Sequence, residues 1–575
     1  MVPSLTLAVT FAFIAAFHLE PRDWETPMQF SGDALVAEAG VMHCAEAGPR
    51  CLVSSVIPRL GAPGVADWAD FPRTEKAWWL VGGLLARWLG LGWAVNLLFL
   101  GAAIGAALTF YLAARRLLAH PAIAAATALL FALSPYLFTR NQQHLALTLY
   151  LAVPIAILVW RRLAQARAPD GMERFFLLLA SAFLGTQTVY YAAYFVIGLV
   201  LVGALQVRWR RPALAWWCGL SVAVTLMVLA LGSLDTLWLV AREGFNRQAV
   251  LRGTNDATNF GLWPEQLFIP SDFHRWPLVR AAVSSYSTRF GLRGEYGSAY
   301  LGLVGAVALL ALLFTFGRRL LLRGAWRAQP WRSPTGRTAG LVLFWLALAM
   351  PWGVLAMVGR STGFAVLRSN NRVSIVLLAV ALLWLGHRLS RWSARRGSAA
   401  PWLVAGVVAS LGLGEQVPLT EPDVDLTYRE RTARTYASAG ALVRRLEGTS
   451  QAPRIFVYPA QSFPEDPRPP FGDPYLPLEL FVTSERAELS FGGVRGRPAG
   501  DWPVEAARMP EDALAQALRT RGFSGLVTHR AACDAQTCLP RLRGVLSQLP
   551  GVEAVEVSGS DWLAWTFNLS PDAGP

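Results

Sequence analysis

The sequence predicts an α-helical polytopic membrane protein with about 11 transmembrane helices and a C-terminal soluble α/β domain. The chain is 54% hydrophobic and only 16% charged, whereas soluble globular proteins average about 25% charged residues. Apolar runs long enough to span a bilayer recur up to about residue 415, and the composition beyond that point is that of a water-soluble domain. We therefore divide the chain into a transmembrane part, 1–415, and a soluble part, 416–575.

The apolar runs give the predicted spans in order. A transmembrane helix needs about 20 mostly apolar residues. The first run has no basic segment before it and no small-residue cleavage site after it, so we expect a retained helix rather than a signal peptide. The stretch 78–89 is apolar but short, and we expect it at the membrane interface. The predicted spans are 3–19, 92–113, 121–139, 144–160, 174–187, 189–206, 213–233, 299–316, 338–358, 372–387 and 401–414.

Arginine clusters between the runs set the predicted orientation. Cytoplasmic loops are enriched in Lys and Arg, and here the clusters occupy alternate connections, at 115–116, 161–174, 208–211, 318–337 and 387–396. The N-terminus is then cytoplasmic, while two long loops, 20–91 and 234–298, and the C-terminal domain lie on the other side. Topology thus accounts for the formal net charge of +14, and we do not infer nucleic-acid binding from it.

The cysteines fit this orientation. Cys44 and Cys51 form one close pair and Cys533 and Cys538 another, and both pairs lie in predicted external regions. Close pairs on that side suggest local disulfides in an oxidising compartment, with free thiols as the alternative. Cys218 lies within an apolar run and is expected to be a packing residue.

The soluble part alternates strand and helix patterns. A buried strand is predicted at 454–458, an amphipathic helix at 511–521 and a second strand at 525–528. The segments 552–557 and 562–567 are expected to pair as closing strands. This order predicts a small α/β domain of about 150 residues.

Ionisable residues gather on the predicted external side. They include Asp33 and Glu38 in the first loop, Arg140-Asn-Gln-Gln-His144 in a short connection and Arg368-Ser-Asn-Asn-Arg372 in the last one. Such groups next to a membrane are costly and therefore indicate a functional site. We find no P-loop, Rossmann glycine pattern, HExxH motif or nucleophile elbow, so the energy for a reaction has to arrive with the substrate, as in a lipid-linked donor.

Several short motifs carry a resemblance to a known class. They are Gly32-Asp33-Ala34-Leu35, Pro58-Arg-Leu-Gly-Ala-Pro63, Asp70-Phe-Pro72, Ser134-Pro135-Tyr136, Gln143-His144, Arg368 to Arg372, Leu489 to Arg497 and Gly522 to Gly525. With the arrangement of spans, they resemble the GT-C class of membrane glycosyltransferases, and in particular bacterial members with a C-terminal periplasmic domain. Many members carry two adjacent acidic residues in the first loop, whereas Asp33 stands alone and Glu38 follows five residues later.

The resemblance implies a membrane glycosyltransferase in the bacterial inner membrane. It would transfer a sugar, with inversion, from a polyprenyl-phosphate-linked donor to an envelope glycan, lipid or protein acceptor on the periplasmic side. Asp33 would be the catalytic base. Arg372, Arg368 and Arg140 are the candidates for the donor phosphate. The candidates for substrate binding are His144, His274, Glu265, Tyr190, Tyr191 and Trp263.

Simpler interpretations remain open at this point. Asp33 is also a favourable N-cap for a helix beginning at Ala34. Arg368 and Arg372 are equally suited to lipid headgroups, and Tyr190 and Tyr191 to an interfacial aromatic belt. No cofactor is indicated, although Glu265, Asp272 and His274 are an alternative site for a divalent cation. The alternative functions are a transporter or flippase for lipid-linked sugars and a structural envelope protein.

Overall fold

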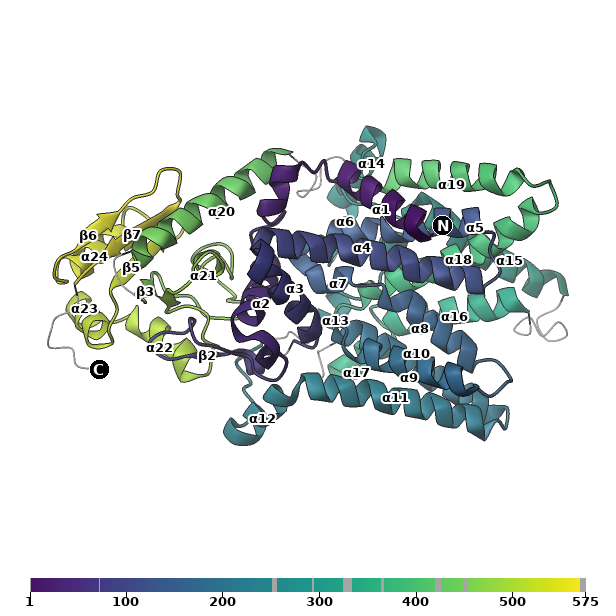
Figure 1. The fold of residues 1–575 in the computed structure, drawn as a ribbon, viewed down its shortest axis with the longest axis horizontal. Coiled ribbons are helices and arrows are strands. Elements are labelled where there is room, and N and C mark those ends of the chain that lie inside the picture. The colour runs from purple at the N-terminus through teal and green to yellow at the C-terminus, as the bar shows by residue number, and fades with distance from the viewer. Residues whose placement is uncertain are drawn as a thin grey trace.

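The computed structural model describes residues 2–71, 73–250, 256–291, 294–323, 333–362, 367–418, 426–448 and 452–568. Pro72 of the Asp70-Phe-Pro72 motif lies outside these residues. A long helical bundle occupies one half of the molecule and a small sheet with its helices the other (Figure 1). The helices α2 (Asp33–Ala47) and α3 (Lys76–Leu89) lie between the two halves, and we call the bundle end nearest to them the sheet-facing end.

All eleven predicted runs are helical in the structure. Within the described residues, eight helical segments are long and apolar enough to cross a membrane. Four of them are single helices: α4 (Leu91–Arg116), α10 (Val189–Arg208), α11 (Pro212–Gly232) and the part Gly302–Leu321 of α15 (Gly302–Arg323). Two on the N-terminal side are built from consecutive helices: Pro121–Arg140 from α5 (Pro121–Ala132) and α6 (Pro135–Arg140), and Gln142–Leu163 from η4 (Gln142–His144), α7 (Leu145–Thr148) and α8 (Ala152–Leu163). The last two are Pro334–Gly359, from α16 (Pro334–Ala349) and most of α17 (Val354–Thr362), and Asn370–Ser393, from η7 (Asn370–Val373) and α18 (Ser374–Ser393).

The other three runs form shorter helices. These are α1 (Val2–Ala16), α9 (Gly171–Gly185) and α19 (Ala400–Gln416), of 15, 15 and 17 residues. The count of about 11 spans therefore includes three helices that fall below the length of about 20 residues that a bilayer requires. The first run is shortened because the helix ends at Ala16 and His18 takes a positive φ of 49°.

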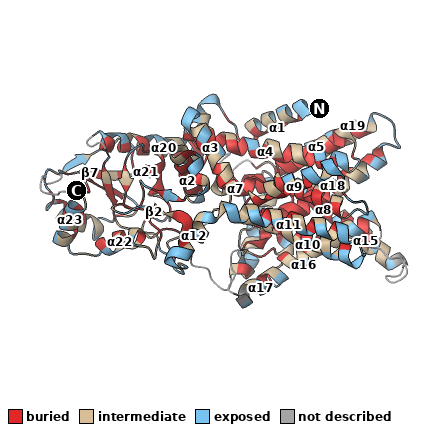
Figure 2. Cartoon of the chain, turned by 60° about the horizontal axis from the view of Figure 1, so that its bottom comes forward, coloured by how far each residue is buried: buried red, intermediate tan, exposed pale blue. Residues whose placement is uncertain are grey.

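Burial separates the central helices from the peripheral ones. Most residues of the span that contains α18 are buried, whereas α11 buries only a few of its side chains. Figure 2 shows the same contrast, with α8 and α18 largely buried and α11 exposing one face. The exposed face of α11 carries Trp216, Leu226, Met227 and Leu231. Apolar side chains on an outer face are what lipid contact requires, so the protein is a membrane protein with a packed helical centre.

The first long loop folds against the sheet-facing end of the bundle. Helix α2 packs on α3 and on α21 (Leu478–Val482), and α3 packs on α4. A disulfide between Cys44 and Cys51 joins the end of α2 to the short helix η2 (Gly48–Leu52). Strands β1 (Val56–Ile57) and β2 (Ala66–Asp67) pair in antiparallel fashion beyond it. The predicted interfacial stretch 78–89 is thus most of α3, a helix packed between two others.

The second long loop contains mostly short helices. They are α12 (Leu234–Glu243), α13 (Asp256–Asn259), η5 (Pro264–Leu267) and α14 (Pro277–Phe290). The loop returns across the sheet-facing end before α15 begins, which brings its later residues close to the ends of several spans.

The soluble part is a five-stranded mixed sheet in the order β4-β3-β5-β7-β6. Its strands are β3 (Arg454–Val457), β4 (Glu488–Leu489), β5 (Gly525–His529), β6 (Glu553–Val555) and β7 (Trp562–Thr566). Strand β3 is parallel to β4 and β5, and β7 is antiparallel to β5 and β6.

Alternation along the strands gives the sheet two buried faces. Ile455 and Val457 belong to the main core with α20 (Leu426–Glu447), while Phe456 packs with α23 (Glu511–Thr520) and α24 (Cys538–Leu546). This follows from the two-residue period of a strand. The predicted α/β character is confirmed. The sequence misses β4 and the long helix α20.

Candidate active site

A glycine turn places Asp33 at the start of α2. Gly32 has φ 57° and ψ −139°, a backbone conformation that suits glycine, and the helix begins at the next residue. The interpretation of Asp33 as the N-cap of a helix starting at Ala34 is wrong, because the helix starts one residue earlier and Gly32 is the cap. The Asp33 side chain is thus available for another role.

Buried amides hold the segment before Asp33 in place. Gln142 Oε1 accepts a hydrogen bond from the backbone N–H of Met28 at 2.9 Å, and its Nε2 donates to Asn96 Oδ1 at 2.6 Å. Asn96 Nδ2 in turn donates to the backbone carbonyl of Thr26 at 2.9 Å. Both amide side chains are almost fully buried. The Arg140–His144 connection is therefore fixed against the residues that lead into α2.

The Asp33 carboxylate lies beside His144. Its Oδ2 is 3.4 Å from His144 Nε2, and 53% of the Asp33 side chain is exposed, so a ligand can reach it. The pKa of Asp33 is raised to about 6, first because its surroundings are desolvated and second because Glu465 lies close, while Arg372 acts in the opposite direction. A carboxylate with such a pKa is ionised at neutral pH and still able to accept a proton.

A second carboxylate, Glu295, joins two arginines next to Asp33. Its Oε2 is 2.7 Å from Arg140 Nη2, and its Oε1 is 3.6 Å from Arg372 Nη2. The side chain of Arg140 is almost fully buried, and that of Arg372 is 13% exposed. The two guanidinium groups lower the pKa of Glu295 well below its ordinary value. One negative and two positive charges leave this group with an excess of one positive charge.

Tyr190 orients Arg372. The Arg372 guanidinium lies over the Tyr190 ring at 4.2 Å from its centroid, a favourable cation–π geometry. The Tyr190 hydroxyl accepts a hydrogen bond from the backbone N–H of Ser369 at 3.3 Å. Tyr191 is buried like Tyr190, but its hydroxyl donates to the Leu147 carbonyl. Only the first tyrosine of the pair therefore contacts a candidate arginine among the described residues.

Arg368 is placed at the edge of this group. Its Nη1 is 3.0 Å from Asp256 Oδ2, its Nη2 is 3.9 Å from Glu465 Oε1, and its guanidinium lies over the Phe260 ring at 5.2 Å. Two carboxylates thus already face Arg368, in contrast to Arg140 and Arg372, which share one.

The soluble part reaches the site through the loop before α21. Asp473 Oδ2 accepts a hydrogen bond from the backbone N–H of Gly32 at 2.6 Å. Glu465 approaches both Asp33 and Arg368 and has a positive φ of 51°. Such backbone strain in a residue other than glycine clusters at functional sites. The Asp33 environment is therefore built by both halves of the chain.

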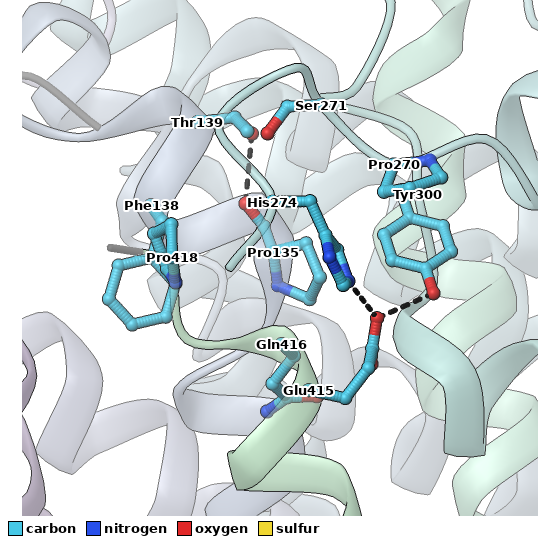
Figure 3. A pocket seen from close by; sticks show the side chains of 10 residues that line it. All are labelled: Pro135, Phe138, Thr139, Pro270, Ser271, His274, Tyr300, Glu415, Gln416 and Pro418. Atoms are coloured by element: carbon cyan, nitrogen blue, oxygen red, sulfur yellow. Dashed lines mark hydrogen bonds and ion pairs between the residues drawn. The ribbon is translucent and has the colours of Figure 1, made fainter. Parts of the chain in front are cut away.

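His274 belongs to a different cluster (Figure 3). Its Nε2 is 2.9 Å from Glu415 Oε1, which also accepts a hydrogen bond from the Tyr300 hydroxyl at 2.7 Å. The other oxygen of Glu415 accepts from the backbone N–H of Leu303 at 2.7 Å. The adjoining cavity holds only about 280 Å³, including its open mouth. We assign this buried network to the anchoring of α15 and α19.

Trp263 and Glu265 line a larger pocket of about 610 Å³, including its open mouth. Tyr296 lines the same pocket and directly follows Glu295. No group of three or more His, Cys, Asp or Glu side chains suited to a metal ion occurs in the part of the chain that the structure describes. Glu265 and His274 are accordingly divided between two cavities, which argues against the alternative cation site with Asp272.

The fold can be compared with known proteins. No protein-family model and no curated protein matches the chain. Arabinofuranosyltransferase AftD from Mycobacteria matches with 16% identity and a TM-score of 0.52, covering 100% of this chain and 40% of AftD. ArnT from Cupriavidus metallidurans bound to undecaprenyl phosphate matches with 16% identity and a TM-score of 0.46, covering 100% and 99%. The oligosaccharyltransferase of Archaeoglobus fulgidus in its apo form matches with 10% identity and a TM-score of 0.45, covering 100% and 75%.

We base the fold assignment on AftD, whose TM-score exceeds 0.5. The present chain spans about two fifths of the length of that enzyme. The chain therefore shares the fold of AftD, in agreement with the fold expected from the resemblance of its motifs to the GT-C class.

Proposed function

We propose that this protein is an inverting glycosyltransferase that takes a sugar from a polyprenyl-phosphate carrier and transfers it to an acceptor of the cell envelope on the periplasmic side. One observation carries the proposal: the reachable carboxylate of Asp33 lies close to Arg372, which is mostly buried and shares Glu295 with the fully buried Arg140, so that the two arginines and Glu295 together have one excess positive charge. A base and a cationic phosphate site are the two parts that such a transfer needs. The GT-C fold supports the assignment, and AftD is itself an arabinofuranosyltransferase.

Asp33 acts as the general base in this mechanism. It removes the proton from the acceptor hydroxyl as the hydroxyl oxygen forms a bond to the anomeric carbon of the sugar. The bond between that carbon and the phosphate oxygen breaks, and its electron pair leaves on the phosphate of the carrier. Attack opposite the leaving group inverts the anomeric configuration. A pKa of about 6 keeps Asp33 ionised at neutral pH while making it a better proton acceptor than an ordinary aspartate.

Arg372 and Arg140 bind the phosphate that leaves. Guanidinium groups donate paired hydrogen bonds to phosphate oxygens. Nε of both arginines is buried and has no hydrogen-bond acceptor among the described residues. Glu295 keeps the two guanidinium groups in place before the donor arrives, and Tyr190 holds Arg372 from the other side. Arg368 already forms an ion pair with Asp256, so it is better suited to the edge of the donor site.

The periplasmic orientation rests on the arginine clusters and on the cysteines. The sheet-facing end carries the Cys44–Cys51 disulfide, and the soluble part carries the Cys533–Cys538 disulfide. Both bonds favour an oxidising compartment on that side of the membrane.

The test is sugar transfer by the purified full-length protein from a panel of polyprenyl-phosphate sugars to envelope fractions. We expect Asp33→Asn to lower the rate by about 10²-fold to 10⁴-fold. Glu46→Gln is the matched control, because Glu46 is a carboxylate on the same helix whose ion pair is with Arg59. It should transfer sugar at close to the wild-type rate.

Turnover by Asp33→Asn at the wild-type rate would remove Asp33 from the mechanism. Movement of lipid-linked sugars across vesicle membranes without any transfer would instead favour the transporter alternative. Against a transporter, Arg140 ends one candidate span and Arg372 lies at the start of another, rather than at mid-depth, where transporters place their sites.

A further inference from the structure

The pocket beside Glu295 is a separate feature of the second long loop. Its walls come from η5, from the C-terminal end of α14 and from Tyr296. Its cavity has a volume of about 190 Å³, below the roughly 300 to 1,000 Å³ of typical small-molecule sites, so only a small ligand or one residue of a larger ligand can occupy it. The side chains that decide its chemistry are Trp263, Glu265, Gln266, Tyr286, Phe290 and Tyr296.

Aromatic rings dominate this pocket and are held by other rings. Tyr286 and Phe290, one helical turn apart on α14, have centroids 4.9 Å apart. Trp263 meets Trp352 edge to face at 4.9 Å. Phe290 is nevertheless 67% exposed. A packed cluster of rings that leaves part of its surface open indicates a surface prepared for a ligand.

Two polar side chains complete the pocket. The carboxylate of Glu265 is exposed and can accept hydrogen bonds, whereas Gln266 is almost fully buried and adds amide atoms to the wall. Aromatic faces next to a few such groups suit a sugar ring, which presents C–H faces to the aromatic rings and hydroxyl groups to its edges. A prenyl chain has no hydroxyl groups to match Glu265 and Gln266.

The position of the pocket relative to the arginines separates acceptor from donor. The Glu295 carboxylate contacts Arg140 and Arg372, while the side chain of the next residue, Tyr296, lines the pocket. The two Cα atoms are only about 3.8 Å apart. The sugar of the donor is bonded directly to the phosphate and must stay on the arginine side. No arginine or lysine among the described residues lines the pocket, so it offers nothing to the donor phosphate, and a sugar bound there is better explained as part of the acceptor.

We infer that this pocket binds a sugar residue of a glycan acceptor. The inference rests on the proposed function and names its acceptor class: a glycan rather than a simple lipid or a protein. Binding of a second acceptor sugar in this pocket would help to orient the acceptor hydroxyl towards Asp33, which raises the rate of transfer.

The first test measures binding alone. The probes are the methyl glycosides of arabinofuranose, mannose, galactose and glucose, and the proteins are the wild type and Asp33→Asn in detergent micelles. Saturation-transfer NMR should show contact between the protein and the ring C–H protons of at least one probe, equally in both proteins. Trp263→Ala and Tyr286→Ala should each weaken it by about threefold to tenfold. Leu278→Ala is the control, because Leu278 lies on α14, is 87% exposed and is not part of the pocket.

The second test uses turnover. With a glycan acceptor, the pocket variants should raise the KM for the acceptor and leave the KM for the donor unchanged. No saturation transfer to any probe, or equal transfer in the wild type and the pocket variants, would overturn the inference. A rise in the donor KM alone would also overturn it and assign the pocket to the carrier lipid.

The outcomes distinguish the two proposals. Binding that depends on Trp263 and Tyr286 in a protein that transfers no sugar would contradict the glycosyltransferase and retain the pocket. Sugar transfer that depends on Asp33 but is unchanged in the pocket variants would support the glycosyltransferase and contradict the pocket as a sugar site.

Discussion

Nε2 of His144 lies 3.4 Å from Oδ2 of Asp33, although the two residues belong to different helices and are separated by more than one hundred positions. The contact exists because Gln142, two residues before His144, holds the backbone of Met28. The same short connection begins with Arg140, the ion-pair partner of Glu295. One five-residue motif thus contacts the proposed base, its supporting segment and the phosphate site.

The pH dependence of transfer should report Asp33. Its pKa is raised to about 6, and only the ionised form can take a proton. We expect kcat/KM to fall tenfold per pH unit well below pH 6 and to level off above about pH 7. The measurement is a pH–rate profile at saturating micelle concentration. A flat profile between pH 5 and pH 8 would contradict the assignment of Asp33 as the base.

Arg372 should affect the donor more than the acceptor. Arg372→Ala removes a guanidinium group from the phosphate site and leaves Glu295 with one partner, so we expect a loss of about 10²-fold to 10³-fold in kcat/KM for the donor. Arg372→Lys keeps the charge without the paired donors and should recover part of that loss. Arg22→Lys is a suitable control, because the Arg22 side chain is 79% exposed and pairs with Glu20. Equal activity of Arg372→Ala and the wild type would exclude this residue from the phosphate site.

Gly32→Ala should disturb the catalytic turn without unfolding the protein. A Cβ at Gly32 would meet Gln143 Nε2 at 3.5 Å, so there is space, but the φ of 57° is unfavourable for alanine. We expect transfer to fall by about tenfold because a 1 Å shift of the base is costly. Gly101→Ala is the control, since its Cβ would meet nothing within 4 Å and the residue lies within α4. A fully active Gly32→Ala variant would show that the turn tolerates alanine.

The packing of the soluble part on α2 should become less stable at high pH. Glu38 on α2 and Glu479 on α21 are both buried, and burial raises the pKa of Glu38 and that of Glu479, the latter to about 8. The folded state therefore holds more protons than the unfolded state between about pH 4.5 and pH 8. By linkage, the free energy of unfolding falls as pH rises through this interval.

The melting temperature followed by tryptophan fluorescence should accordingly drop by several degrees between pH 5 and pH 8.5. Glu479→Gln should flatten this dependence, because its amide cannot ionise. Glu505→Gln, an exposed carboxylate on α22 (Pro498–Ala506), should retain the slope. A melting temperature that rises with pH over this interval would contradict the prediction.

Part of this site can be predicted from the sequence for a physical reason. Spanning helices must be apolar, so charged residues at their ends are conspicuous, and Arg140 and Arg372 are singled out in this way, while Asp33 is singled out by its motif in the first long loop. The strands and the helix predicted at 454–458, 511–521 and 525–528 appear as β3, α23 and β5 because their burial follows regular periods.

Glu295, Glu465 and Asp473 lack such a signal. Each lies in a polar loop among other charged residues, where no periodicity marks one carboxylate over another. Glu295 reaches the arginines only because the second long loop folds back over the bundle, and Glu465 and Asp473 come from a part of the chain that the sequence presents as a separate domain. Long-range contacts of this kind decide the electrostatics of the site and are not encoded in any local pattern.

The sharing of Glu295 between Arg140 and Arg372 has a consequence for the catalytic cycle. The donor is a phosphodiester with a single charge, whereas the spent carrier is a monoester with a charge of about −1.5 to −2 at neutral pH. A site with one surplus cation holds the doubly charged species more tightly. Departure of the empty carrier, rather than glycosidic bond formation, should then limit turnover, and added polyprenyl phosphate should inhibit competitively against the donor.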